Sequence, residues 1–88
     1  MKSYITEKDR EACKKVLELP QSTISSRPRV DYLREAFDDP FEYSGFIGLM
    51  MVELSNLEIG RDESISIMSD IALAGLSVSR ADMMKRTA

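Results

Sequence analysis

The densest apolar run of the chain spans residues 39–60 and reads DPFEYSGFIGLMMVELSNLEIG. Its first residues carry three signals for the start of a helix. Asp39 can accept a hydrogen bond from an amide of the first turn, and Pro40 has no amide that would be left without a partner there. Glu42 stands where the second carboxylate of a capping box belongs. These signals predict a helix that begins at Pro40.

Gly60 supplies the matching stop, because glycine readily takes the left-handed conformation that closes a helix. The predicted helix covers about residues 40–59 and is roughly 30 Å long. Its bulky side carries Tyr43, Phe46, Ile47, Met50, Leu54 and Leu57, and its shallow opposite side carries Ser44, Gly48 and Ser55. A helix that is apolar around most of its circumference is normally buried, so we expect this one to be central and shielded from water on both sides.

Shorter amphipathic segments precede this helix. Thr6 and Asp9 have the spacing of a capping box and predict a helix that Pro20 stops. A serine-rich linker follows and leads into a short helix from Pro28 to Asp38. Both segments place their apolar residues on one side, so we expect them to cover the central helix.

After Gly60 the sequence predicts two more helices. Asp62 can cap a helix over about residues 63–74, and Gly75, followed by an apolar residue, predicts a Schellman-type end. A last helix over about residues 80–87 starts after Ser79. The core side of the fourth helix is expected to carry Ile65, Met68, Ala72 and Leu76, widened by Ile67 and Ile71.

No segment alternates with a period of two over enough residues to form a strand. The sequence therefore predicts an all-α fold, a small bundle of about five helices around the central one. Eighty-eight residues suit one domain, so residues 1–88 are expected to form a single helical domain. An apolar fraction of 43% beside 31% charged residues is ordinary for a globular protein.

The distribution of charge argues against nucleic acid as a partner. The net charge is −3, and residues 20–60 hold three basic residues against seven acidic ones. Such a segment repels phosphate backbones. The single cysteine allows no internal disulfide, and no apolar signal-peptide core follows Met1, so we expect a cytoplasmic protein. The uncharged part of the central helix, residues 43–52, is too short to span a bilayer.

Several kinds of chemistry are excluded by residue type. The chain has no histidine, which removes the usual general base and the commonest metal ligand. Its four glycines match no phosphate-binding loop. Cys13 lies on an apolar side with Ala12 and Val16, so it is expected to be a buried and inert thiol. We therefore predict no catalytic residue, no cofactor and no metal site.

One functional hypothesis is protein–protein interaction. Some small or apolar residues exceed what one thin core needs, and methionine adapts to many recognition surfaces. The alternative is that all of them are core. If they are exposed, we expect a homodimer or a partner that docks on the helices, and a small regulator or inhibitor that occludes its partner, as in many small bacterial or phage proteins. The candidate partner-binding residues are Ser44, Gly48, Ser55, Leu73, Met83 and Met84.

The second hypothesis is a helix-turn-helix DNA-binding regulator formed by the helices over about residues 63–74 and 80–87. Glycine in the turn suits such a motif, and Arg80, Lys85 and Arg86 on the second helix would contact DNA. Two features oppose it. Ile71 stands where a small residue is expected, and the second helix has only about two turns.

Overall fold

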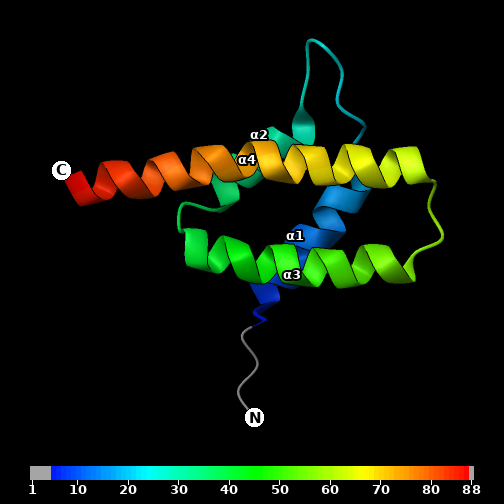
Figure 1. Cartoon of the computed structure of the whole chain (residues 1–88), viewed down its shortest axis with the longest axis horizontal. Helices are drawn as coiled ribbons and strands as arrows, with labels where there is room; N and C mark the ends of the chain where they lie inside the picture. The colour runs from blue at the N-terminus through cyan, green and yellow to red at the C-terminus, as the bar shows by residue number, and fades with distance from the viewer. Residues whose placement is uncertain (1–4, 88) are drawn as a thin grey trace.

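The computed structural model describes residues 5–87, which form four α-helices and no strand (Figure 1). The helices are α1 (Glu7–Glu18), α2 (Pro28–Ala36), α3 (Pro40–Asn56) and α4 (Arg61–Thr87). The predicted all-α fold is confirmed, but the predicted number of about five helices is wrong. The two helices expected after Gly60 are one continuous helix.

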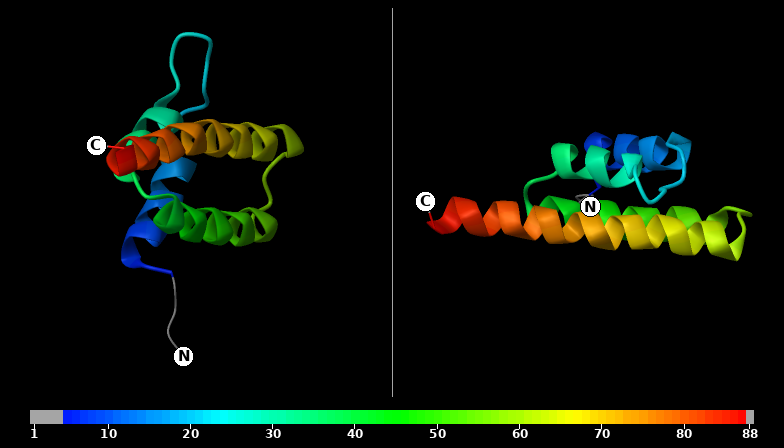
Figure 2. Two further views of the ribbon diagram at one scale, coloured as in Figure 1. Left: turned by 60° about the vertical axis from the view of Figure 1, so that its left-hand side comes forward. Right: turned by 90° about the horizontal axis from the view of Figure 1, so that it is seen from above.

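The helices are arranged in two layers. α3 and α4 run antiparallel and side by side, and α1 and α2 cover one side of this pair (Figure 2). Within this arrangement α2 packs mainly on α4, and α1 packs mainly on α3. The Cα trace is only 16 Å thick along its shortest axis. The side of the α3–α4 layer that faces away from α1 and α2 is therefore left without a covering helix.

The predicted N-caps at Thr6 and Asp39 are present. The Thr6 hydroxyl accepts from the Asp9 amide at 3.2 Å, and the Asp9 carboxylate accepts from the Thr6 amide at 3.1 Å. At the start of α3, the Asp39 carboxylate accepts from the Phe41 amide at 2.9 Å. Glu42 has a different role from the predicted capping-box carboxylate, because its carboxylate lies 3.7 Å from the Lys8 ammonium on α1.

The predicted stop at Gly60 is wrong. α3 ends at Asn56, because Leu57 is already extended, with φ −92° and ψ 143°. Leu57 is consequently exposed rather than on the buried side. No described residue has a positive φ, so Gly60 does not close α3 in the left-handed conformation. Its carbonyl instead accepts from the Ser64 amide at 3.0 Å and begins α4. Asp62 therefore lies inside the first turn of α4 rather than capping it.

The predicted helix end at Gly75 is also wrong. Gly75 keeps a helical conformation inside α4, and a Cβ atom there would lie 3.3 Å from Cε2 of Tyr43. The Tyr43 hydroxyl donates a hydrogen bond of 2.5 Å to the carbonyl of Ile71, one turn earlier. Gly75 thus permits the Tyr43 ring to lie directly against α4. The glycine serves helix packing, not helix termination.

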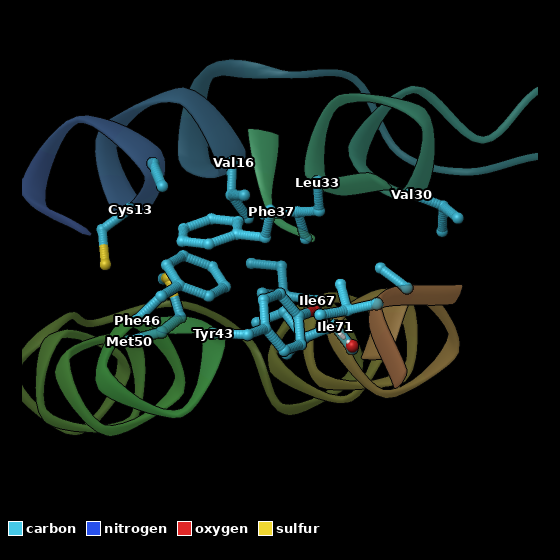
Figure 3. Close-up of a cluster of buried hydrophobic side chains, with 13 residues drawn as sticks. Cys13, Val16, Val30, Leu33, Phe37, Tyr43, Phe46, Met50, Ile67 and Ile71 are labelled. Carbon is cyan, nitrogen blue, oxygen red and sulfur yellow. Dashed lines mark hydrogen bonds between the residues drawn. The ribbon is translucent and has the colours of Figure 1, made fainter. Parts of the chain in front are cut away.

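The core lies between the two layers and draws on all four helices (Figure 3). The rings of Phe37, Tyr43 and Phe46 form its centre, with centroids 5.3 to 5.5 Å apart. Aromatic rings at such separations attract one another beyond the burial of their area. The buried hydrophobic residues are Ala12, Cys13, Val16, Val30, Leu33, Phe37, Tyr43, Phe46, Met50, Ile67, Ile71, Ala74 and Val78.

A buried ion pair joins the layers beside this core. Nη1 of Arg29 on α2 lies 3.2 Å from Oδ2 of Asp70 on α4. The Arg29 Nε also donates to the carbonyl of Val16 at 3.2 Å, and the Ser22 hydroxyl lies 2.9 Å from the Asp70 carboxylate. These bonds satisfy both charges and tie the end of α1 and the linker to α4. Removing one partner would leave a buried charge without compensation.

We therefore expect Asp70→Ala to lower the free energy of unfolding by about 3–5 kcal/mol, because Arg29 loses its counter-charge inside the protein. Urea titration followed by circular dichroism measures this loss. Arg10→Ala is the control, since it breaks only the exposed pair with Glu7 and should change stability by less than about 1 kcal/mol. Equal losses in the two variants would show that burial adds nothing to the Arg29–Asp70 pair.

Two glycines allow a second, matched comparison. Nothing lies within 4 Å of a Cβ built at Gly48, whereas a Cβ at Gly75 meets the Tyr43 ring. Gly48→Ala should raise the free energy of unfolding by about 1 kcal/mol through helix propensity alone. Gly75→Ala should gain clearly less, because the Tyr43 ring must shift. The same urea titrations measure both, and equal gains would contradict the tight contact at Gly75.

Candidate interaction surface

α3 is shielded from water on one side only. Tyr43, Phe46 and Met50 are buried as predicted, with Ile47 and Leu54 partly buried. The shallow side of Ser44, Gly48 and Ser55 is exposed. The expectation of a rod covered on both sides is wrong, because α1 and α2 pack on the same side of the α3–α4 layer. We call the opposite, exposed side of this layer the outer face.

The outer face carries large apolar side chains from both helices. Val52 follows the buried Tyr43 by nine residues, and Leu76 follows the buried Ile67 by nine. Nine residues are two and a half turns, so both side chains project directly away from the core. Six large residues on this face are 53% to 75% exposed: Phe41, Met51, Val52, Ile65, Leu76 and Met83.

The middle of the outer face has no charge. α3 is uncharged from Tyr43 to Val52, and α4 has a single charged residue, Asp70, between Ser64 and Ser79. Asp70 is buried in its pair with Arg29 and does not reach the outer face. A groove of about 330 Å³ separates the helices; its lining residues include Pro40, Ile47, Ala72, Leu76 and Ser79. A contiguous apolar surface of this kind is a characteristic of interaction sites.

Three of the predicted partner-binding residues lie together on the α3 part of the outer face. They are Ser44, Gly48 and Ser55, and all are exposed. The Ser44 hydroxyl donates to the carbonyl of Phe41 at 2.7 Å, and the Ser55 hydroxyl donates to that of Val52 at 2.8 Å. Each hydroxyl therefore uses its proton in a hydrogen bond to the backbone of its own helix. The side chains add little height and present no donor that a partner would have to satisfy.

The other three predicted residues are exposed on α4 but do not share one direction. Met83 follows Leu76 by two turns and lies on the outer face. Leu73 lies instead beside α2, in a shallow groove that it shares with Val30 and Arg34. Met84 follows Leu73 by eleven residues, or three turns, and lies on the same edge as Leu73. Four of the six residues thus lie on the outer face, three on α3 and Met83 near the C-terminal end of α4.

Sequence reasoning missed the largest contributors to this surface. Ile65, Ala72 and Leu76 were expected on the core side of α4, but all three are exposed. The stripe that does face the core is Ile67, Ile71, Ala74 and Val78. Ending the helix at Gly75 hid this stripe, because it separates Val78 from the other three. Reading residues 61–87 as one helix reveals both stripes.

The arrangement required by the DNA-binding hypothesis is not formed by the described residues. α4 continues through Gly75, so no turn separates two helices. Arg80 faces the groove beside α2, where Arg27 and Arg34 also lie. Lys85 bonds to Asp38, and Arg86 lies 3.0 Å from Asp82. The three predicted contacts therefore point in different directions. The Lys85 ammonium lowers the pKa of Asp38, and that carboxylate raises the pKa of Lys85.

Cys13 is buried in the core and has no disulfide partner. Burial raises the pKa of its thiol to about 11, and the nearby carboxylates of Glu53 and Asp9 add to the shift. The predicted burial of Cys13 is confirmed, and a neutral thiol is a poor nucleophile. Across residues 5–87, no three His, Cys, Asp or Glu side chains are grouped so that they could hold a metal ion. None of the described helices has the length and hydropathy needed to cross a membrane.

The Cys13 thiol should make stability depend on pH in the alkaline range. Its pKa is higher in the folded chain than in the unfolded one, so its contribution is fully present below about pH 8.5 and is lost as the pH rises toward 11. Comparing wild type with Cys13→Ala cancels the other titrating groups. Urea titrations at pH 8 and pH 10.5 should show that the stability advantage of wild type narrows. A difference that does not change with pH would contradict the raised pKa.

Comparison of the chain with protein-family models, with curated proteins and with solved structures found no match.

Proposed function

We propose that this chain is a non-enzymatic protein-interaction module that binds through the outer face of α3 and α4. The observation that carries the proposal is the outer face itself, whose middle has no charge and which exposes six large apolar side chains along its length. A surface that carries large apolar side chains and no charge along its middle would normally be buried. In the isolated chain this face is exposed to water, and a bound partner would bury it.

The size of the surface agrees with a specific interface. Large apolar residues have on the order of 150–200 Å² of surface each, so six of them at 53–75% exposure leave roughly 600 Å² accessible. This equals the upper end of about 300–600 Å² for the largest apolar patch of a typical monomer. It also approaches the roughly 800 Å² per partner that a standard protein interface buries. Exposed Gly48 and Ser44 between these side chains allow a partner helix to approach closely.

The proposed mode of action is occlusion. Two antiparallel helices, with the Ser44 and Ser55 hydroxyls of α3 bonded to their own backbone, offer shape and apolar area but few polar groups for sequence-specific recognition. Such a surface suits a small regulator or inhibitor that covers an apolar surface of its partner. We also propose a cytoplasmic setting. The fold does not depend on a disulfide, and the free thiol of Cys13 is buried with a raised pKa, which protects it from oxidation.

Site-specific photo-crosslinking in cells that make the protein natively tests this proposal. A photoreactive phenylalanine at Met51 or Leu76 should give discrete adducts, because both positions lie on the outer face. The same group at Ile24, which is fully exposed in the α1–α2 linker, or at Glu18 should give none. Gel shifts and mass spectrometry measure the adducts.

A matched pair of substitutions provides the control. Leu76→Glu should reduce the adduct formed from Met51 by roughly tenfold or more, since it places a charge at the centre of the apolar face. Ile24→Glu adds the same charge at a still more exposed site and should leave the adduct unchanged. Adducts only from Ile24 and Glu18, or none from either outer-face position, would refute the proposed function.

A further inference from the structure

α4 carries a regular seam along the outer face. Eight exposed residues follow one another at alternating spacings of three and four: Asp62, Ile65, Ser69, Ala72, Leu76, Ser79, Met83 and Arg86. This is the spacing of the contact positions of a coiled coil, which keeps one stripe of a helix against a neighbouring helix. The seam is roughly 36 Å long and lies on the side of α4 opposite the core stripe.

The composition of this seam is symmetric about residue 74. Positions at equal distances on either side are Asp62 and Arg86, Ile65 and Met83, Ser69 and Ser79, and Ala72 and Leu76. Two antiparallel copies of α4, related by a two-fold axis at residue 74, would place each residue opposite its counterpart. Asp62 of one copy would then lie opposite Arg86 of the other at both ends of the seam, and Ile65 would pack on Met83. Ser69 would lie opposite Ser79, and the small side chain of Ala72 would leave room for Leu76 of the other copy.

Charge near the ends of α4 favours the same orientation. Residues 58–63 hold three acidic residues and Arg61, and residues 80–86 hold three basic residues and Asp82. An antiparallel pair brings the negative end of one copy to the positive end of the other. A parallel pair would bring like charges together, which costs affinity. The antiparallel helix dipoles add to the preference.

The outline of the protomer provides space for this arrangement. The C-terminal part of α4 projects past the start of α3 (Figure 1). In the antiparallel register the projecting part, with Met83, would lie on the N-terminal half of the other α4. There Ile65 is flanked by the α3 of that copy, whose exposed Met51 and Val52 extend the apolar surface on which Met83 would pack.

We propose that the partner of the outer face is a second copy of this chain, bound as a two-fold symmetric dimer through the antiparallel α4 seam. The inference rests on the proposed function and specifies the occupant of that face. The interface is isologous, because each seam residue faces its counterpart across the axis and the contact repeats on the other side. Two pairs of Asp62 and Arg86 close its ends.

Disulfide trapping tests the register. Ile65→Cys and Met83→Cys are prepared separately, and each is oxidised alone and in a mixture; wild type shows whether the buried Cys13 takes part. The antiparallel seam predicts a crosslinked dimer in the mixture and little in either variant alone. Self-crosslinking of Ile65→Cys would show a parallel register, and absence of crosslinks in the mixture would show no seam contact. Either result overturns the proposal.

Charge exchange tests the ends of the seam without relying on disulfide formation. Sedimentation velocity should show that Asp62→Arg or Arg86→Asp alone weakens self-association by roughly tenfold or more, because two like-charge contacts replace two ion pairs. The double variant should recover to within about threefold of wild type. Asp82→Asn is the control, since it removes the intrahelical partner of Arg86 but leaves the seam intact. Failure of the double variant to recover would exclude this pairing.

The outcomes also separate this inference from the proposed function. Photo-adducts from Met51 with twice the 10.0 kDa mass of the chain support both. Adducts with a different protein, from a chain that sediments as a monomer at high concentration, overturn the dimer and leave the interaction surface standing. A monomer without outer-face adducts overturns both.

Discussion

The contact on which the rest of the structure depends is the crossing of Tyr43 over Gly75. Its hydroxyl bonds to the backbone of α4 at Ile71, and its ring lies where any Cβ at residue 75 would be crowded. This contact fixes how closely α3 and α4 approach and places them in one layer. The same ring meets Phe37 and Phe46, so this contact is continuous with the aromatic centre of the core. A continuous outer face is the consequence of these two helices lying in one plane.

The Arg29–Asp70 pair sets the rotation of α4 within that layer. A buried carboxylate must face its counter-charge, so Asp70 has to point toward α2. Once Asp70 points inward, the helical period turns Leu76 and Ile65 away from the core. Leu76 also borders the groove beside α2. Together with the Tyr43 contact at Ile71 and Gly75, the ion pair favours burial of the stripe that carries Ile67, Ile71, Ala74 and Val78.

Two local signals, the N-caps at Thr6 and Asp39, predicted helix starts correctly, whereas Gly60 and Asp62 did not act as predicted and the long-range contacts were not predicted. The starts of α1 and α3 depend on side chains within three residues of the amides they cap, so Thr6 and Asp39 predict them directly. Gly75 has the same appearance in a sequence whether it ends a helix or receives a ring from residue 43. The exposure of Ile65 and Leu76 also could not be predicted locally, because it depends on the pairing of Asp70 with Arg29, 41 residues away in the sequence. The small residues of α3 were identified as a surface because their size, unlike their burial, is visible in the sequence.

The thinness of the protein explains why one helix has two apolar stripes. A chain of 88 residues buries only about 60–70% of its unfolded surface, and its two short helices cover only one side of the long pair. A helix meant for water on its second side would carry charges along it, yet α4 keeps its exposed charges to its ends. Such charges do not stabilise the middle of the helix, but they can define where a second helix begins and ends against it. This distribution of charge is typical of a helix that is buried on both sides. One side of α4 packs on helices of the same chain, and we propose that the other packs on a second copy.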